Sequence, residues 1–314
     1  MTRKEILRRF QVFIVWERHG ERAPHKPLLI LYAIGKLLLG EERLCYKEIE
    51  GDLRELLKEF GPHRSSYRPQ DPFWRLKNAR NPEDRIWEIP NEHKISESRR
   101  SDGTSTGDAL IGDLREHGVG GFLPPIAAQL RNDVDLRFEI VGRLLGSHFP
   151  VTYHADILQA VGIEWTFGWA IGIPPQLQAP GPQLNPRNPR FRSEVLEAYR
   201  HRCAICGFNV MLDDRPIAIE AAHIKWHSAE GPDIPQNGMA LCALHHKLFD
   251  RGVFTLSDEL TIRVSEQVDS TSIGFEEWLA QFDGRDIYFP SEQTYYPDEG
   301  YVHWHGEQVF KGRI

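Results

Sequence analysis

Two pairs of potential metal ligands constrain the fold of this 314-residue chain more than any other feature. Cys203-x-x-Cys206 is followed, after 35 intervening residues, by Cys242-x-x-His245. Three thiolates and one imidazole satisfy the tetrahedral coordination of Zn²⁺ and leave no open position. The alternative is that these cysteines are unrelated buried side chains, because free cysteine is among the most buried residue types. The ligand spacing of both pairs favours a structural zinc site.

Cysteine content and hydropathy limit the class of protein. The chain has four cysteines, and three of them lie in this region, which excludes a disulfide scaffold. The longest apolar stretch, residues 27–40, contains Lys36 and is shorter than the roughly 20 residues of a membrane-spanning helix. The amino terminus alternates charged and apolar residues and shows no secretory signal. We therefore expect a cytoplasmic protein with no membrane contact.

The net charge of −7 conceals a gradient along the chain. Residues 1–100 contain 21 Lys and Arg against 16 Asp and Glu, whereas residues 251–314 contain 5 against 12. An acidic chain of this kind can still present a basic face to a polyanion such as DNA.

A proline-rich segment divides the chain. Six of the sixteen residues from Pro174 to Pro189 are proline, a density that disfavours helices and central strands and favours an extended spacer. The sequence therefore predicts an α+β protein of two domains. Its parts are a mainly helical domain over residues 1–165, a linker over residues 166–189 and a second domain over residues 190–314.

Hydrophobic periodicity gives the elements of each domain. Apolar residues three or four positions apart predict helices over residues 4–18, 26–39, 46–60, 107–117, 124–131 and 133–148. Short alternating aromatic and charged runs predict a small hairpin or a pair of loops over residues 72–76 and 85–89. The second domain is predicted to contain helices over 190–202 and 243–249, a strand over 217–222 and a strand pair over 253–256 and 260–264.

Two histidines and an asparagine lie between and beside the zinc ligands. His223 follows the predicted strand, Asn237 lies 14 residues later, and His246 lies 9 residues after that. The segments CAICG, IEAAHIKWHS and NGMALCALHHKLFDRG resemble the HNH, or ββα-metal, nucleases, specifically the HNH domains of McrA-like type IV restriction endonucleases. This resemblance covers residues 191–264 and implies a nuclease domain that a structural zinc stabilises.

Phosphodiester hydrolysis needs a base to deprotonate water and a cation to neutralise charge on the phosphoryl oxygens. By resemblance, His223 is the general base, Asn237 holds the base and its loop in place, and His246 with Asp250 binds catalytic Mg²⁺ or Mn²⁺. His246 and Asp250 are four residues apart and can share one face of the predicted helix. His245 is turned by about 100° from His246 and is available to the zinc.

One position departs from the nuclease pattern. Many nucleases of this family have Asp or His directly before the base as a further metal ligand, and Ala222 stands there in this chain. The predicted catalytic metal therefore has few protein ligands. Glu220 lies two residues earlier on the same predicted strand face and is a weak substitute.

The first domain carries a second resemblance. The segments HKPLL, EFGP, PFWRL, IWE and GGFLP, in this order between residues 25 and 124, resemble the sulfur-binding domain that precedes HNH modules in phosphorothioate-dependent restriction endonucleases. Such domains bind DNA in which sulfur replaces a non-bridging phosphate oxygen. Sulfur is more polarisable and more weakly hydrated than oxygen, so an apolar cup beside cations can favour it. The candidate DNA- and sulfur-binding residues are His25, Lys26, His63, Arg64, Arg68, Asp71, Pro72, Phe73, Trp74, Arg75, Arg99 and Arg100.

Three functions remain open at this point. The first is an endonuclease that recognises phosphorothioated double-stranded DNA and cuts nearby, expected as a homodimer because each centre cuts one strand. The second is a reader of another mark, such as a methylated base, joined to the same nuclease. The third is a zinc-stabilised DNA-binding regulator with an inactive HNH centre, which Ala222 favours and the set of His223, Asn237 and His246 opposes.

Overall fold

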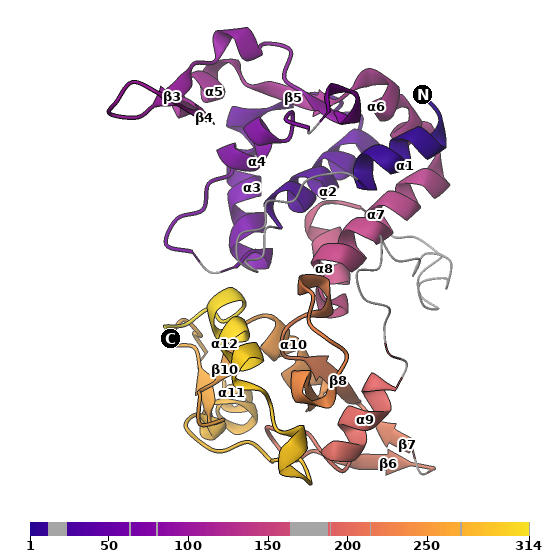
Figure 1. Cartoon of the computed structure of the whole chain (residues 1–314), viewed down its shortest axis with the longest axis vertical. Helices are drawn as coiled ribbons and strands as arrows, with labels where there is room; N and C mark the ends of the chain where they lie inside the picture. Colours follow the sequence, from indigo (N-terminus) through magenta and orange to yellow (C-terminus); the bar gives the residue numbers. More distant parts are fainter. Residues whose placement is uncertain are drawn as a thin grey trace. The chain divides into compact units, whose positions relative to one another are not determined.

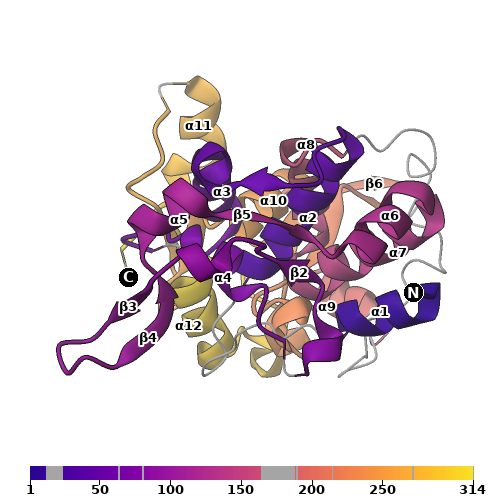
Figure 2. The ribbon, with the colours of Figure 1, turned by 90° about the horizontal axis from the view of Figure 1, so that it is seen from above.

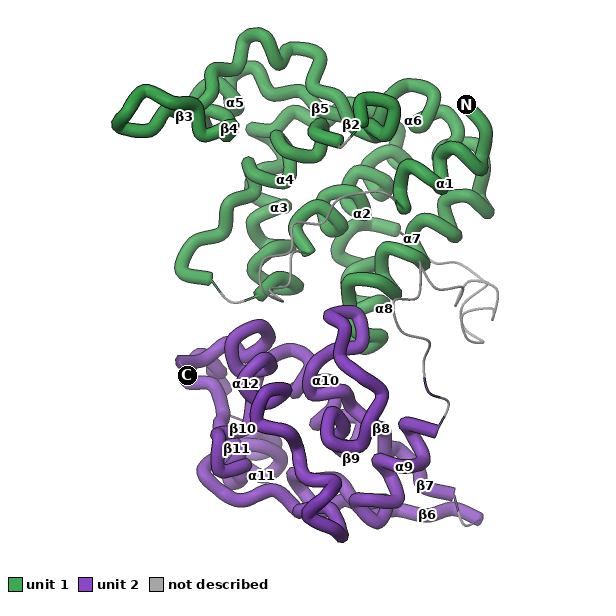
Figure 3. Tube along the Cα trace, viewed as in Figure 1, with its two compact units in different colours: residues 1–182 green, residues 183–314 purple. Residues whose placement is uncertain are grey.

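A computed structural model describes residues 1–11, 24–62, 64–79, 81–163, 188, 190–213, 215–270 and 272–313. Contacts along the chain divide it into two compact units, residues 1–182 and 183–314 (Figure 3). The predicted linker over residues 166–189 lies outside the described residues except for Asn188. None of the helices in the described segments combines the length and apolar character of a membrane span.

The first unit contains eight helices and five short strands among its described residues (Figure 1). They are α1 (Arg3–Gln11), α2 (His25–Leu38), β1 (Leu44–Cys45), α3 (Tyr46–Phe60), α4 (Gln70–Arg75), β2 (Trp87–Glu88), β3 (Glu97–Arg99), β4 (Ser105–Ala109), α5 (Ile111–His117), β5 (Val119–Phe122), α6 (Pro124–Asn132), α7 (Val134–His148) and α8 (Val151–Ala160).

Helix α2 is the centre of this unit. Its side chains are buried at nearly every position from Pro27 to Leu37, and it packs against α3, α4, α6 and α7. A helix that is apolar all round needs neighbours on every side, which explains why this segment is enclosed by other helices. Figure 1 shows α2 running between α3 and α7.

A small sheet covers part of this helical core. Strand β5 is central and pairs antiparallel with β1 on one side and β2 on the other. A Cβ on Gly120 would lie 2.7 Å from the Trp87 ring and 2.9 Å from the Phe73 ring. Glycine at this position therefore allows the aromatic side chains to pack directly against the strand. A separate hairpin, β3 and β4, extends away from the rest of the unit (Figure 2).

Two predictions for this unit are wrong. Residues 72–76 and 85–89 do not form a hairpin, because residues 70–75 are helix α4 and β2 pairs instead with β5, Trp87 opposite Phe122. The helix predicted over residues 107–117 begins at Ile111, because residues 105–109 belong to β4. The predicted helix over residues 46–60 is confirmed at both ends, and those near residues 26–39, 124–131 and 133–148 are confirmed within a few residues. The predicted helix over residues 4–18 is confirmed as far as Gln11, after which the chain leaves the described residues.

The second unit contains α9 (Phe191–Ala198), β6 (Val210–Leu212), β7 (Arg215–Ile217), β8 (Ile219–His223), β9 (Gly238–Cys242), α10 (Ala243–Asp250), β10 (Phe254–Leu256), β11 (Ile262–Val264), α11 (Ile273–Trp278) and α12 (Glu299–Gln308). Strands β8 and β9 are antiparallel, with His223 opposite Gly238 and Ile219 opposite Cys242. Helices α9 and α10 pack on this pair. The order β8, β9, α10 is the ββα arrangement expected from the sequence.

The predicted elements of this unit agree in type with the structure. The strand predicted over residues 217–222 is β8, which starts at Ile219 because Ala218 has a left-handed φ of 57° and interrupts the chain after β7. The predicted strand pair is confirmed as β10 and β11. Near the carboxyl end, Trp304 and His305 are buried in the second unit, where the His305 ring stacks on Phe249 with ring centroids 3.7 Å apart.

Candidate active site and zinc centre

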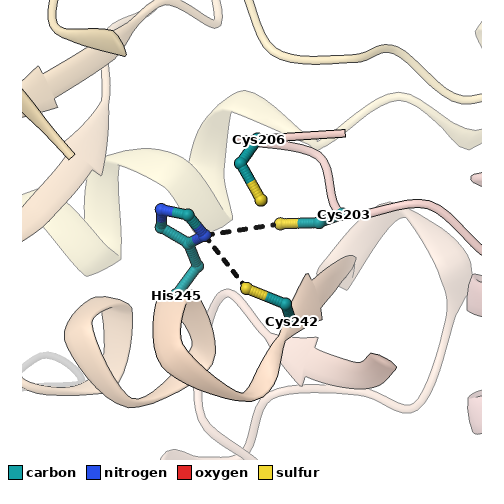
Figure 4. A group of neighbouring side chains, drawn as sticks. All are labelled: Cys203, Cys206, Cys242 and His245. Carbon is teal, nitrogen blue, oxygen red and sulfur yellow. Dashed lines mark hydrogen bonds between the residues drawn. The ribbon is translucent and has the colours of Figure 1, made fainter. Parts of the chain in front are cut away.

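The four predicted zinc ligands converge in the second unit (Figure 4). Cys203 and Cys206 lie in the turn after α9, Cys242 ends β9, and His245 lies in the first turn of α10. Their ligand atoms all lie within 4.8 Å of one another, and Cys203 and His245 are fully buried. A tetrahedral zinc with bonds of about 2.0–2.3 Å requires ligand atoms roughly 3–4 Å apart, so this donor set fits the metal.

Electrostatics at this cluster also suit a cation. Hydrogen bonds from the Cys203 and Cys206 thiols hold the pKa of Cys242 below its usual range. Burial lowers the pKa of His245, but Cys206 and Cys242 outweigh it and raise the pKa to about 9. Hydrogen bonds to Cys206 and Cys242 raise the pKa of Cys203, so the cluster favours thiolate charge at Cys242, and thiolate is the ionisation state that binds metal.

The tautomer of His245 follows from a contact outside the cluster. His245 Nε2 lies 2.6 Å from the main-chain carbonyl oxygen of Trp278, at the end of α11. A carbonyl can only accept, so Nε2 carries the proton and Nδ1 is the nitrogen that faces the thiols, 3.1 Å from Cys242 Sγ. Such outer hydrogen bonds orient metal-binding histidines. The sequence could not reveal this partner, because a main-chain carbonyl has no sequence signature.

His223 ends β8 and is held by two neighbours. Its Nε2 lies 2.7 Å from Asp233 Oδ1, and its ring stacks on Phe191 of α9 with centroids 4.0 Å apart. The side chain is 22% exposed, so the predicted base is reachable from solvent. Sequence reasoning missed Asp233, which lies in the loop between β8 and β9.

Asn237 is completely buried and ties this loop together. Its Oδ1 accepts a hydrogen bond from the main-chain N–H of Lys225 at 2.8 Å. Its Nδ2 donates to the carbonyl oxygens of Lys225 and Pro232, both at 2.9 Å. The Asn237 amide thus joins the two ends of the loop that follows His223. These contacts suit the predicted role of Asn237, which is to hold the base and its loop in place.

His246 lies between two carboxylates. Its Nδ1 is 2.6 Å from Glu220 Oε2, and its Nε2 is 3.4 Å from Asp250 Oδ2. Burial lowers the pKa of His246, but Asp250 and Glu220 together raise it above its ordinary value. Glu220 is half-exposed and Asp250 is buried. Among the described residues, only the predicted zinc ligands form a group of three or more side chains whose donor atoms lie close enough to hold one metal ion. Glu220, His246 and Asp250 do not form a second group of this kind.

The candidate DNA-binding residues of the first unit gather partly on α2 and α4. Burial and the nearby Arg75 lower the pKa of Lys26. Arg75 Nε donates to Asp108 Oδ1 at 2.8 Å, and Arg68 lies 3.3 Å from Asp71. Arg64 is half-buried and lies in the segment before α4. His25 is the first residue of α2.

Other predicted residues of this set lie elsewhere. Phe73 and Trp74 are buried, at 0% and 3% exposure, so the Phe73 ring presents no surface to a ligand in this conformation. Pro72 is buried beside them. Arg99 and Arg100 lie at the exposed end of the β3–β4 hairpin. His63 lies outside the described residues.

Two family models match the chain. The model of the ScoMcrA-like DNA sulfur-binding domain matches residues 3–166, just over half of the chain. The chain belongs to this ScoMcrA-like sulfur-binding domain family. The model of the HNH endonuclease matches residues 203–257, which include the zinc ligands, His223, Asn237, His246 and Asp250. The chain is therefore an α+β protein in which a sulfur-binding domain is followed by an HNH domain.

Several solved structures are similar to parts of the chain. The modification-dependent TagI restriction endonuclease is 24% identical over 39% of this chain and 38% of that chain, with a TM-score of 0.29. The sulfur-binding domain of SprMcrA complexed with phosphorothioated DNA is 21% identical over 52% and 95%, with a TM-score of 0.41. The type IV phosphorothioation-dependent restriction endonuclease ScoMcrA is 13% identical over 76% and 93%, with a TM-score of 0.38. The match to TagI thus spans less than half of the TagI chain. A comparison with curated proteins found no match.

Proposed function

We propose that this protein is a phosphorothioation-dependent restriction endonuclease, which binds sulfur-modified double-stranded DNA with residues 1–165 and cuts it with residues 190–314. The observation that carries the proposal is the presence of both family matches in one chain. A sulfur-binding domain supplies recognition of the modified backbone, and an HNH domain supplies hydrolysis. Residues 166–189 then serve as the linker between them.

Recognition is assigned to the basic residues near α2 and α4 and to the β3–β4 hairpin. Lys26, Arg68 and Arg75 provide cations for the DNA backbone, and Arg99 and Arg100 extend this charge along the exposed hairpin. Asp108 accepts from Arg75 and fixes the direction of its guanidinium. The assignment of the sulfur contact to Pro72 and its aromatic neighbours rests on the resemblance alone, because Pro72, Phe73 and Trp74 are buried in this structure.

Hydrolysis is assigned to His223, which accepts a proton from the attacking water as general base. A bound Mg²⁺ or Mn²⁺ would neutralise charge on the phosphoryl and leaving oxygens. His246 and the half-exposed Glu220 place an imidazole and a carboxylate side by side, donors of the types that such an ion takes, and water or phosphate oxygens would complete its coordination. We assign Glu220 and His246 to the metal. Asp250, which the sequence predicted as a metal ligand, is instead assigned to orient the His246 ring through its Nε2 atom.

The remaining assignments concern the zinc, the assembly and the site of action. Cys203, Cys206, Cys242 and His245 would hold Zn²⁺ as a closed structural site. A homodimer would bring together two centres, one for each DNA strand. Because the proposed substrate is DNA inside the cell, we expect the protein to act in the cytoplasm.

The test is incubation of the full chain with two plasmids of identical sequence, one phosphorothioated and one unmodified, with Mg²⁺, Mn²⁺ or EDTA. We expect double-strand cuts only in the modified plasmid and only with a divalent cation. Equal cutting of both plasmids would refute dependence on sulfur. Binding of modified DNA without cutting, under every metal condition, would favour the regulator with an inactive centre.

A matched pair of variants assigns the base. His223→Ala should retain binding of the modified plasmid and lose cleavage by about 10²–10⁴-fold, because it removes the proton acceptor and not the reader. His303→Ala is the control, because His303 is an exposed histidine on α12 that pairs with Glu307. Loss of DNA binding in His223→Ala alone would move His223 to recognition.

A further inference from the structure

The loop between β8 and β9 places a carboxylate on the proposed base. Asp233 Oδ1 lies 2.7 Å from His223 Nε2, and the Asp233 side chain is only 8% exposed. We propose that Asp233 is the positioning residue of His223, whose carboxylate fixes the ring tautomer that can accept a proton at Nδ1. This inference rests on the proposed nuclease function.

The tautomer follows from the chemistry of the contact. An ionised carboxylate can only accept hydrogen bonds, so the short contact requires His223 Nε2 to carry the proton. In the neutral ring the lone pair then lies on Nδ1, which becomes the nitrogen that takes the proton from water. The same carboxylate stabilises the positive charge that the ring acquires in that step, as the aspartate of a Ser-His-Asp triad does for its histidine.

Asp233 is itself held in place. Its Oδ2 accepts a hydrogen bond from the main-chain N–H of Asn188 at 2.6 Å. The residues on either side of it are fixed by Asn237, which donates to Pro232 O from its side chain and to Ile234 O from its main chain, both at 2.9 Å. The carboxylate therefore has one oxygen for His223 and one for the backbone, on a segment anchored at both flanks.

The His223 ring is restrained in two directions. Phe191 lies parallel to it, with an interplanar angle of 18°, which limits tilting of the ring. The bond to Asp233 limits rotation about the side-chain axis. His227 also approaches Asp233, but its Nε2 is 4.0 Å from Oδ2, beyond hydrogen-bond distance. Asp233 thus serves His223 rather than His227.

The experiment compares the full-length wild type, Asp233→Asn and a control, Asp258→Asn, whose carboxylate lies exposed in the turn between β10 and β11. Ring ¹⁵N NMR of histidine-labelled protein, with the His223 signals assigned by their loss in His223→Ala, reports which nitrogen carries the proton. We expect Nε2–H in the wild type and in Asp258→Asn. In Asp233→Asn the amide can also donate to Nε2, so the Nδ1–H form should gain population.

Kinetics on phosphorothioated DNA give the second measurement. Asp233→Asn should lower kcat by about 10²–10⁴-fold with KM changed by less than about twofold, because positioning of the base affects the chemical step and not binding. Asp233→Glu, which keeps the carboxylate, should restore part of kcat. A wild-type His223 in the Nδ1–H form, or a kcat in Asp233→Asn equal to that of the wild type, would overturn the inference.

The two measurements also separate this inference from the proposed function. The ring spectra are recorded without DNA, so they decide the tautomer even if the wild type fails to cut modified plasmid. The wild-type spectrum likewise decides it if Asp233→Asn folds poorly. Absence of cleavage by the wild type counts against the nuclease proposal alone.

Discussion

Replacing one zinc ligand should unfold the second unit and leave the first unit folded. Cys203 is fully buried, and its neighbours Ala204 and Ile205 belong to the apolar core of the second unit. A structural zinc contributes about 10–16 kcal/mol of apparent binding free energy near neutral pH, whereas a whole domain is stable by only about 5–15 kcal/mol. Loss of the metal therefore removes as much free energy as the folded unit has. Cys203→Ser should abolish its cooperative unfolding transition at 25 °C.

The assay is calorimetry combined with elemental analysis. The wild type should bind one zinc per chain and show a transition for each unit, and Cys203→Ser should lose the zinc and the transition of the second unit. Cys45→Ser is the control, because Cys45 belongs to the first unit, at the end of β1. A zinc-free Cys203→Ser protein with the wild-type melting profile would refute the structural role of the metal.

Three further outcomes follow from individual contacts. Gly238→Ala should destabilise the second unit by about 1–3 kcal/mol in urea unfolding, because the added methyl overlaps a side chain of α9. The double substitution Arg99→Ala and Arg100→Ala should weaken binding to modified and unmodified duplexes alike and reduce the salt slope by up to about two, as fluorescence anisotropy would show. Hydrogen bonds from Arg115 lower the pKa of Glu50 in the folded state, so its stabilisation is present above about pH 4.3 and is lost as pH falls through the folded pKa. The stability difference between the wild type and Glu50→Gln should therefore shrink below about pH 4, and a constant difference would contradict this.

Local patterns predicted the elements whose causes are local. Residues 46–60 form a helix because their apolar side chains repeat with the helical period, and seven of their side chains are buried. The convergence of the four candidate zinc ligands was predictable because they come in two pairs, each fixed by a short turn or helix start. The false hairpin at residues 72–89 has the opposite origin. The partner of β2 is β5, more than thirty residues later, and no spacing rule identifies a partner at that distance.

The candidate active site likewise contains residues that the sequence reveals and residues that only the folded chain reveals. Asn237 and His246 could be found because they match the HNH pattern that the sequence resembles, but Asp233 could not, because an acidic residue in a loop resembles any solvated side chain. Its role depends on the path of the loop, which Asn237 fixes through Pro232 and Ile234. A sequence can reveal the residues that define a motif, whereas the groups that orient them become visible only when the loop is folded.

The alanine before the proposed base has a structural explanation that weakens the argument for an inactive centre. Ala222 is fully buried and lies opposite Met239 in the β8–β9 pair, so it belongs to the core of the unit. Glu220, on the same strand, is half-exposed and contacts His246 at 2.6 Å. The nuclease pattern places Asp or His directly before the base, and we propose that Glu220, two residues earlier in the strand, supplies a carboxylate in its place. Ala222 is part of the core of the second unit, and Glu220 and His246 remain the donors that we propose for a divalent ion.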